Sequence, residues 1–382
     1  MKKVFPILAI STFSSMLGVG IIAPLLPLYA ESLGASGLWI GVIFAAFSIS
    51  RSVFMPLVGR ISDRKGRRRF IVVGLLLYAA ISLGYVWAGH VAELTLVRLL
   101  HGVASAMIIP IAQAYIGELS PKGEEGRWMG YFNACFFTGF AFGPLLGGLL
   151  TDYLSMEAAF YTMGALNLLA FLTALSLLPE VLPEKVRSRS PRPSFLSMRG
   201  SDLMKGLVSY RLVYAVGRGS YMTFLPIFAA AALHLTPGQI GVVVAIHMLI
   251  VSLSQAFSGR IADVFDRKAM VIVGSLVSLG FLGLIPFTHN LWQLLGLSAF
   301  GALGGTLALP AASALTVEEG RKYGMGSALG LFNMAMSAGM SVGPIIGGVV
   351  NDALGVNAVF YVGAGIGAVG TALFVRFTAR YP

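Results

Sequence analysis

The sequence predicts an all-α integral membrane protein with twelve transmembrane helices in two pseudo-symmetric six-helix bundles. Three observations predict this fold: an apolar composition, apolar segments long enough to cross a bilayer, and an internal repeat. Of the 382 residues, 57% are hydrophobic and 11% are charged, and the mean hydropathy is +0.83. A soluble domain needs more polar residues than this to cover its surface, so the bilayer is the expected solvent.

The apolar segments follow one another along the chain, separated by charged or turn-rich clusters. A helix needs about 20 apolar residues to cross the hydrocarbon core. The segments are too long for the ~10-residue strands of a membrane barrel, so we expect helices. The first follows Lys2 and Lys3, but it is too long for a signal peptide, so we expect it to be retained. The expected spans are 5–30, 38–58, 70–89, 94–116, 128–150, 157–179, 205–231, 239–258, 269–287, 291–315, 326–350 and 357–376.

The basic residues predict the orientation of these helices. With the N-terminus placed inside, all but four of the 27 lysines and arginines fall in cytoplasmic loops or tails. Because this is the positive-inside pattern, we expect a multi-pass protein of the cell inner (cytoplasmic) membrane with both termini in the cytoplasm. The net charge of +11 is then a topology signal, and we expect no nucleic-acid partner. The four exceptions, which lie within expected spans, are Arg51, Arg98, Arg211 and Arg218.

A polar segment rich in proline, serine and arginine divides the chain into six spans and six spans. Its composition is typical of a hydrophilic linker. We therefore predict a first bundle over residues 1–180, a cytoplasmic linker over 181–203 and a second bundle over 204–382.

The two predicted bundles repeat each other at an offset of 200 residues. Because each has an even number of spans, both enter the membrane in the same orientation, and a substrate site is expected near the midplane between them. Matching pairs include Gly59 and Gly259, Asp63 and Asp263, Pro110 and Pro310, Asn133 and Asn333, Gly143 and Gly343, Pro144 and Pro344, and Asp152 and Asp352.

Three motifs add chemical information. The loop after the second span reads Gly59-Arg60-Ile61-Ser62-Asp63-Arg64-Lys65-Gly66-Arg67-Arg68, with glycines that permit a tight turn and one acid among many cations. A second copy begins at Gly259 but departs after Asp263, so its role stays open. The fourth span carries Arg98, followed by His101 and Gly102. The fifth span carries closely spaced small residues and a helix-bending proline, at Gly130, Gly139, Gly143, Pro144, Gly147 and Gly148.

On these motifs, and over essentially its whole length, the chain resembles the major facilitator superfamily, in particular its twelve-span drug:proton antiporters of multidrug efflux. The resemblance implies a conformational gate in the loop and an antiporter signature in the fifth span. Two simpler interpretations stay open. The cations of the loop can serve only to anchor it on the cytoplasmic side. The glycines of the fifth span can serve only helix packing, without bearing on transport direction. The implied gate residues are Gly59, Asp63, Arg64, Gly66 and Arg67. The implied antiporter-type motif comprises Gly139, Gly143, Pro144, Gly147 and Gly148.

Polar side chains at membrane depth are costly, so they are candidates for a substrate cavity. Arg51 and Arg211 lie nearer the cytoplasmic ends, where their side chains can snorkel. No Asp or Glu falls in the middle of an expected span. Such a cavity favours anionic, zwitterionic or neutral amphipathic cargo, unlike the many drug:proton exporters with an intramembrane carboxylate. The candidates are Arg98, His101, Gln113, Asn133, Arg218, His247 and Asn333.

The expected function is secondary active transport by alternating access, with proton-coupled efflux (antiport) of a small amphipathic or anionic solute. The coupling proton has several candidate carriers, namely His101, His247, Asp63 and Glu118. Proton-coupled uptake, transport of lipid-like molecules or organic anions, and a membrane sensor remain alternatives. Neither a nucleotide-binding loop nor a zinc-protease motif occurs, so we expect no enzyme, cofactor or metal. The expected partners are a small-molecule substrate, protons and the lipid bilayer, with a monomer as the functional unit.

Overall fold

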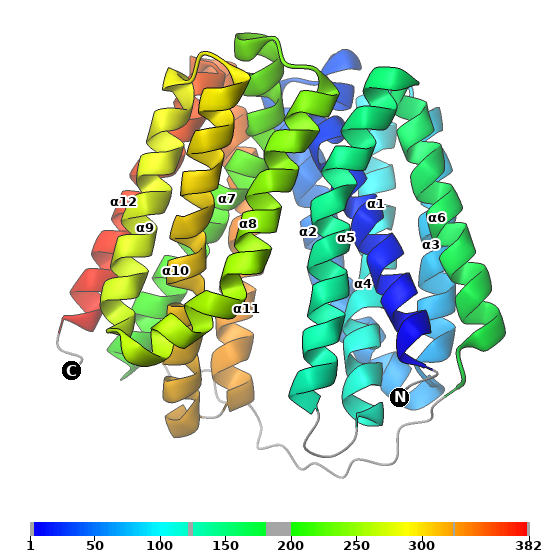
Figure 1. Ribbon diagram of the computed structural model, residues 1–382, viewed down its shortest axis with the longest axis horizontal. Helices are drawn as coiled ribbons and strands as arrows, with labels where there is room; N and C mark the ends of the chain where they lie inside the picture. The colour runs from blue at the N-terminus through cyan, green and yellow to red at the C-terminus, as the bar shows by residue number, and fades with distance from the viewer. Residues whose placement is uncertain (1–3, 121–124, 181–199, 324, 380–382) are drawn as a thin grey trace. The chain divides into compact units, whose positions relative to one another are not determined.

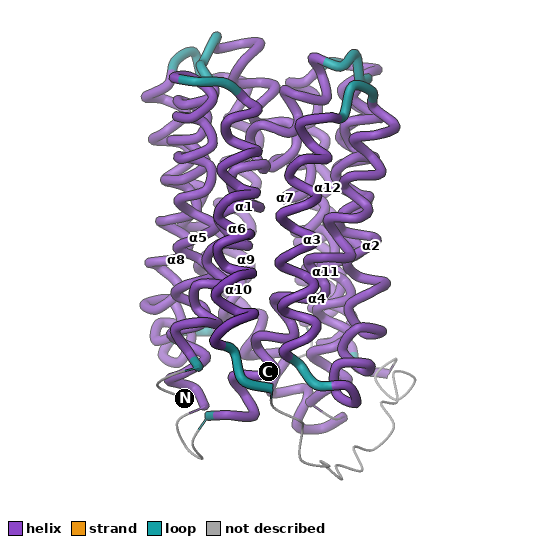
Figure 2. The backbone as a smooth tube through the Cα atoms, turned by 90° about the vertical axis from the view of Figure 1, so that its right-hand side faces the viewer, coloured by secondary structure: helices purple, strands orange, loops and turns teal. Residues whose placement is uncertain are grey.

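A computed structural model describes residues 4–120, 125–180, 200–323 and 325–379. Within helices, it leaves the side chains of residues 63, 117–118, 125–127, 255–264, 321, 323 and 325–327 undescribed. In the described ranges the chain is helical apart from short turns, and no strand occurs there (Figure 2). This confirms the predicted all-α fold.

The described helices are long enough and apolar enough to cross a membrane. Eleven of them contain a strongly apolar window of 18 residues. The exception, α7 (Asp202–Leu233), has 32 residues, and its Arg211, Arg218 and hydroxyl-bearing side chains lower its hydropathy. Twelve α-helices therefore match the twelve expected spans in order.

The helices form two compact units. The first unit comprises Met1–Ala35, Val42–Arg187 and Leu235–Ala245, and the second comprises Ser36–Gly41, Ser188–His234 and Ile246–Pro382. Helices of the N-terminal repeat are α1 (Phe5–Ser32), α2 (Gly37–Lys65), α3 (Arg68–Trp87), α4 (Val91–Leu119), α5 (Glu125–Tyr153) and α6 (Met156–Leu177). After α7, the C-terminal repeat continues with α8 (Pro237–Val264), α9 (Arg267–Leu284), η2 (Ile285–Phe287), α10 (Leu291–Tyr323), α11 (Met325–Leu354) and α12 (Val356–Thr378).

Corresponding helices pack against each other in the two repeats (Figure 1). In the first unit α1 packs most closely against α5, and α3 packs against α6 and α4. In the second unit α7 packs against α11, and α9 packs against α12 and α10. The repeat detected in the sequence is thus also a repeat of helix packing, so positions 200 residues apart can be compared directly.

Helices α2 and α8 are each divided between the two units. The start of α2, up to Gly41, belongs to the second unit, and the start of α8, up to Ala245, belongs to the first. In the second unit, the Asp352 carboxylate accepts hydrogen bonds from the Gly37 and Leu38 backbone N–H groups, at 2.6 and 2.9 Å. In the first unit, Asp152 accepts from the Gly238 N–H at 3.0 Å and from the Thr236 hydroxyl at 2.7 Å. Each carboxylate caps a helix start, where N–H groups lack partners and negative charge is stabilised.

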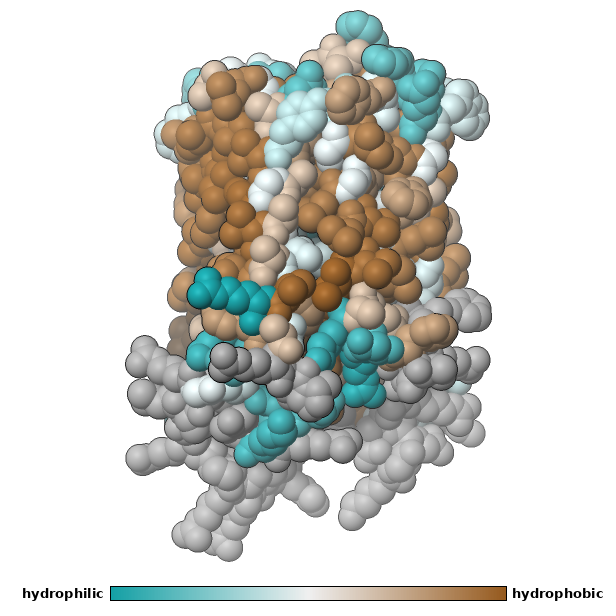
Figure 3. All heavy atoms as spheres, turned by 90° about the vertical axis from the view of Figure 1, so that its left-hand side faces the viewer, coloured by the Kyte–Doolittle hydropathy of each residue, from teal (hydrophilic) through white to brown (hydrophobic). Residues whose placement is uncertain are grey.

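The surface is that of a membrane protein. Apolar side chains cover most of the face shown in Figure 3, and hydrophilic ones gather toward its two ends. Leu276 and Val369 are more than half exposed, as expected for side chains that face lipid. Trp87 and Trp292, at helix ends, are 73% and 78% exposed. Tryptophan at such positions is typical of the membrane–water interface.

Candidate functional site

The loop motif forms a tight connection between α2 and α3. Gly66 has φ +91°, a left-handed conformation that glycine adopts without strain, and its N–H donates to the Ser62 carbonyl at 3.0 Å. A Cβ on Gly66 would collide with the side chain of Glu180, whose Oε1 accepts from the Arg68 N–H at 3.3 Å. Glu180 is a contact that the sequence reasoning missed.

The other predicted gate residues differ in exposure. Arg67 is buried and precedes α3 as its N-cap residue, whereas Arg64 is exposed. Gly59 has open space where a side chain would lie. The side chain of Asp63 lies outside the described part of the chain, so the gate stays a prediction.

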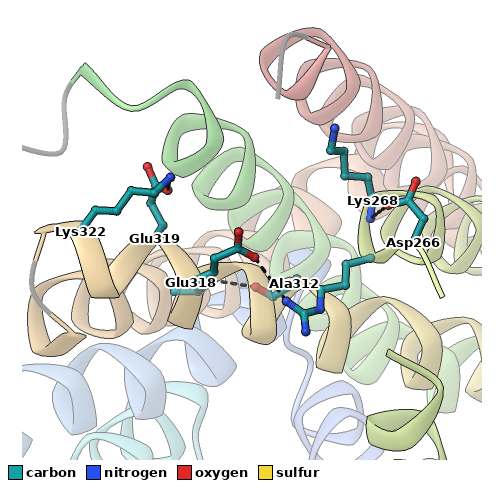
Figure 4. Close-up of polar contacts among 8 residues, drawn as sticks. Asp266, Lys268, Ala312, Glu318, Glu319 and Lys322 are labelled. Carbon is teal, nitrogen blue, oxygen red and sulfur yellow. Dashed lines mark hydrogen bonds and ion pairs between the residues drawn. The ribbon is translucent and has the colours of Figure 1, made fainter. Parts of the chain in front are cut away.

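The second copy of the loop motif connects helix ends in the second unit (Figure 4). Asp266 caps α9, because its carboxylate accepts from the Lys268 N–H at 2.9 Å. Arg267 lies 3.3 Å from Glu318, near the C-terminal end of α10. Glu319, almost fully buried, accepts from the Ser201 hydroxyl before α7 and pairs with Lys322 at 3.0 Å. These contacts tie the ends of α7, α9 and α10 together.

The glycines of the antiporter-type motif bring α5 against α1. A Cβ on Gly139 would lie 2.6 Å from the Phe13 carbonyl oxygen, and one on Gly147 would lie 2.9 Å from that of Ile21. Gly143 faces the Leu17 carbonyl and Gly20 in the same way. Pro144 lies inside α5, and Gly148 contacts Pro237 and Gly238 at the start of α8. Gly339 and Gly343 of α11 repeat these contacts on α7. In the part of the chain that the structure describes, these glycines allow α5 to pack closely against α1.

Arg98 lies in a closed aromatic pocket of the first unit. It is 5% exposed, and its guanidinium carbon lies 4.4 Å from the Phe47 ring centroid, a cation–π distance. The guanidinium donates to the Tyr85 hydroxyl and, through Nε, to the Ile43 carbonyl, each at 3.4 Å. Its described partners are neutral, so no carboxylate offsets its charge in that part of the chain.

His101 continues this chain of contacts. Its Nδ1 lies 2.8 Å from the Tyr85 hydroxyl, which can accept from Arg98 and donate to the imidazole. The ring is fully buried, and the edge-on ring of Tyr78 lies 4.5 Å away. Among the described groups, Nε2 has no hydrogen-bond partner. The sequence predicted the Arg98–His101 pair but missed Tyr85, because a tyrosine carries no charge to mark it.

The remaining predicted polar residues do not converge with Arg98. Gln113 is half-buried, and both Asn133 and Asn333 are exposed on α5 and α11. Arg211 is buried against the Phe332 ring, at 4.7 Å, and the Met336 sulfur. The candidate proton carrier Glu118 has no described side chain.

Arg218 and His247 line a cavity inside the second unit. The cavity is only partly enclosed and lies among α7, α8, α9, α10 and α12. Its polar lining includes Tyr210 and Tyr221 besides the two predicted residues, and its apolar lining includes Phe281. No Asp or Glu lines it, and every lining residue belongs to the described part of the chain.

The polar groups of this cavity are incompletely paired. The described partner of the Arg218 guanidinium is the Met248 sulfur, at 3.9 Å, a weak acceptor. His247 Nδ1 lies 3.0 Å from the Ser298 carbonyl oxygen, so Nδ1–H donates and Nε2 is left for another group. Tyr210 is 3% exposed, and its hydroxyl has no partner among the described groups. An oxygen-bearing or anionic ligand would accept from the guanidinium and the tyrosine hydroxyl.

Comparison with known proteins identifies relatives along the whole chain. A family profile described as Major Facilitator Superfamily matches residues 8–212 and 207–382. An uncharacterized MFS-type transporter of Methanocaldococcus jannaschii is 31% identical over 376 residues, covering 96% of this chain and 97% of that protein. Quinolone resistance protein NorA of Staphylococcus aureus is 26% identical, covering 97% and 95%. The crystal structure of the nucleoside transporter NupG has the same fold, with TM-score 0.84, 18% identity and coverage of 98% and 99%.

Proposed function

This chain belongs to the Major Facilitator Superfamily, and from that premise we propose that it exports a small amphipathic solute in exchange for protons. Members of this superfamily named above are membrane transporters, not enzymes. The observation that carries the substrate class is the cavity around Arg218, which contains a guanidinium and no carboxylate among its lining residues. The cargo is anionic, zwitterionic or neutral.

The electrostatics of the cavity support this substrate class. A guanidinium in a low-dielectric site without a counter-charge is costly, and a bound anion offsets that cost. A cationic ligand would instead add to the repulsion. Methionine and aromatic side chains around the charge, including Met222, Met248 and Phe281, give an adaptable apolar wall for the remainder of the solute.

The direction of transport is inferred from the sequence relatives. Quinolone resistance protein NorA, which aligns along nearly the whole chain, confers resistance according to its name, and export of a compound is a direct route to resistance. The fifth-span glycine motif resembles that of antiporters. Together these support efflux over uptake.

A flux experiment tests the proposal. Inside-out vesicles from cells that overproduce the chain are given an acidic lumen and a panel of anionic, zwitterionic, neutral and cationic amphipathic fluorophores. We expect accumulation of one or more of the first three classes, lost with a protonophore and absent from vesicles without the chain. Accumulation that persists with the protonophore would refute proton coupling, and exclusive accumulation of cations would refute the substrate class.

Alternating access requires a switch, and we assign it to the loop containing Asp63 and its neighbouring arginines. Replacing Asp63 by Asn removes the only acid of that motif while keeping its size. We expect Asp63→Asn to abolish flux while leaving the amount of inserted protein unchanged, whereas Glu31→Gln, an exposed acid at the end of α1, keeps flux. Full activity of Asp63→Asn would remove the loop from the mechanism.

A further inference from the structure

The cavity around Arg218 is lined by glycines where the other repeat has larger residues. Four glycines that line it on α10 and α12 stand 200 residues after larger residues of α4 and α6. All four of the larger residues are fully buried. The pairs are Gly301 and His101, Gly305 and Ser105, Gly363 and Met163, and Gly367 and Asn167. Phe281, Tyr214 and Leu279 take up the side-chain space at Gly301, Gly305 and Gly367, whereas Gly363 faces open space.

The two repeats also exchange a small and a large residue between neighbouring helices. In the first unit Gly18 of α1 leaves room for Met163 of α6, whose Cγ lies 2.8 Å from where a Gly18 Cβ would be. In the second unit Arg218 stands at the position of Gly18, and Gly363 stands at that of Met163. The Gly363 position has space, since a Cβ there would meet only Leu282, at 3.8 Å. The second repeat thus places a cation where the first repeat has a packed core.

A cavity of this kind is not a random packing gap. Groups with unused hydrogen-bonding capacity line it: the half-buried Arg218 guanidinium and the buried hydroxyls of Tyr210 and Tyr221, which have no partner among the described groups. Buried polar groups are normally hydrogen-bonded, so several unsatisfied groups facing one space indicate an occupant that accepts hydrogen bonds. A carboxylate accepts from an arginine and a tyrosine together and offsets the positive charge.

The apolar side of the cavity fits the body of an amphipathic molecule. Leu279 and Leu282 of α9 lie over the glycines of α12 and touch the space that a Cβ of Gly367 or Gly363 would take. Their side chains are flexible, and each can turn away from a glycine surface without moving backbone. Because the cavity opens on one side, an apolar chain longer than the enclosed space can extend out of it.

From this geometry we propose that the cavity in the second unit binds an amphipathic organic monoanion. Its anionic head pairs with Arg218, and its apolar body lies between Leu279, Leu282 and the glycines of α12. The inference rests on the proposed function for its place in transport, but the binding site itself is testable without any flux.

Binding is measured with tritiated octanoate on purified protein in nanodiscs, by scintillation proximity without an ion gradient. Octyltrimethylammonium, which has the same chain and the opposite charge, serves as the competing cation. We expect saturable octanoate binding that the cation does not displace. Arg218→Gln should weaken octanoate binding by roughly 10-fold or more, because it removes a charged hydrogen-bond donor to the carboxylate.

A matched pair of glycine substitutions tests the position of the site. Gly363→Met restores the side chain of the first repeat and fills the cavity, so octanoate binding should be lost. Gly365→Met makes the same change two residues away on the exposed face of α12, where a Cβ meets nothing within 4 Å, and binding should be kept. Arg376→Gln, an exposed arginine of the same helix, controls for loss of a positive charge. Thermal unfolding of each variant checks that it is folded.

The outcomes separate this inference from the proposed function. Unchanged octanoate binding in folded Gly363→Met or Arg218→Gln protein would overturn the site, as would preferential binding of the cation. In either case, gradient-driven flux of a panel compound would leave the proposed export intact. Conversely, binding that is lost in both variants, together with no flux of any compound, would uphold the site and refute the transport proposal.

Discussion

The two repeats treat an intramembrane arginine in opposite ways. Arg98 in the first unit is enclosed by Phe47 and Tyr85, and the fully buried His101 completes the cluster. Arg218 in the second unit faces a cavity bordered by glycines, with a methionine sulfur as its described partner. The same helix arrangement therefore supports a closed polar core in one repeat and an open binding space in the other. The difference is a matter of side-chain volume at equivalent positions.

This comparison indicates that the two arginines have different tasks. Arg98 has a hydroxyl, a carbonyl and an aromatic ring as partners within the first unit, so we expect it to stabilise that unit. The described partner of the Arg218 guanidinium is a methionine sulfur, a weak acceptor, so we expect this guanidinium to bind a ligand. From the sequence, both arginines were predicted to line a substrate cavity.

The largest expected effect comes from opening the first repeat to resemble the second. Met163→Gly removes a fully buried side chain from α6 and adds a helix glycine, so it should destabilise the protein by about 3–6 kcal/mol. Unfolding in mixed micelles of lipid and dodecyl sulfate measures the change. Leu169→Gly, which is 60% exposed on the same helix, should cost only about 1 kcal/mol. Equal losses would show that the first repeat is not tightly packed at this point.

A smaller loss is expected from breaking the Arg98 cluster without opening a cavity. Tyr85→Phe keeps the ring but removes the hydroxyl between Arg98 and His101, which should destabilise the protein by about 1–3 kcal/mol. Tyr161→Phe, about half exposed on α6, should leave the unfolding free energy unchanged. Unfolding in the same micelles compares the two, and no loss in Tyr85→Phe would contradict the idea of a satisfied core around Arg98.

The smallest effect is expected at the capped helix starts. Asp352→Asn should cost about 0.3–1 kcal/mol, because an amide keeps an acceptor for the Gly37 N–H but loses the charge at the helix N-terminus. Asp152→Asn should cost a similar amount, since Asp152 also sits at a helix start, where it accepts from the Gly238 N–H and the Thr236 hydroxyl. Differential scanning fluorimetry at low and high salt measures both. A loss of stability in only one of them would show that the two repeats differ here too.

Much of the fold followed from the sequence. The bilayer requires long apolar segments and a positive inner face, and both requirements leave a strong signal in one dimension. Helix α7, which lacks a strongly apolar window of 18 residues, was still detected because its apolar run is long. The repeat predicted which helices correspond, and the packing of α1 on α5 and of α7 on α11 agrees with it.

The sites were predicted less completely. Charge marked Arg98, His101, Arg218 and His247, because an ionisable residue in a span is rare. Tyr210 went unnoticed, since tyrosine is common in membrane helices and only its missing partner makes it informative. Asn133 and Asn333 are exposed on their helices, and their place in a substrate cavity stays a prediction.

By itself the sequence determined the membrane class, the number and order of the helices and the charged residues worth testing, because each depends on local composition or on a simple repeat. Only the tertiary structure decided that Arg98 is enclosed and that Arg218 borders a cavity. That outcome depends on residues such as Met163 and Gly363, which are distant in the chain and carry no charge. Their effect is the volume they fill between neighbouring helices, and volume between helices exists only once the helices have packed.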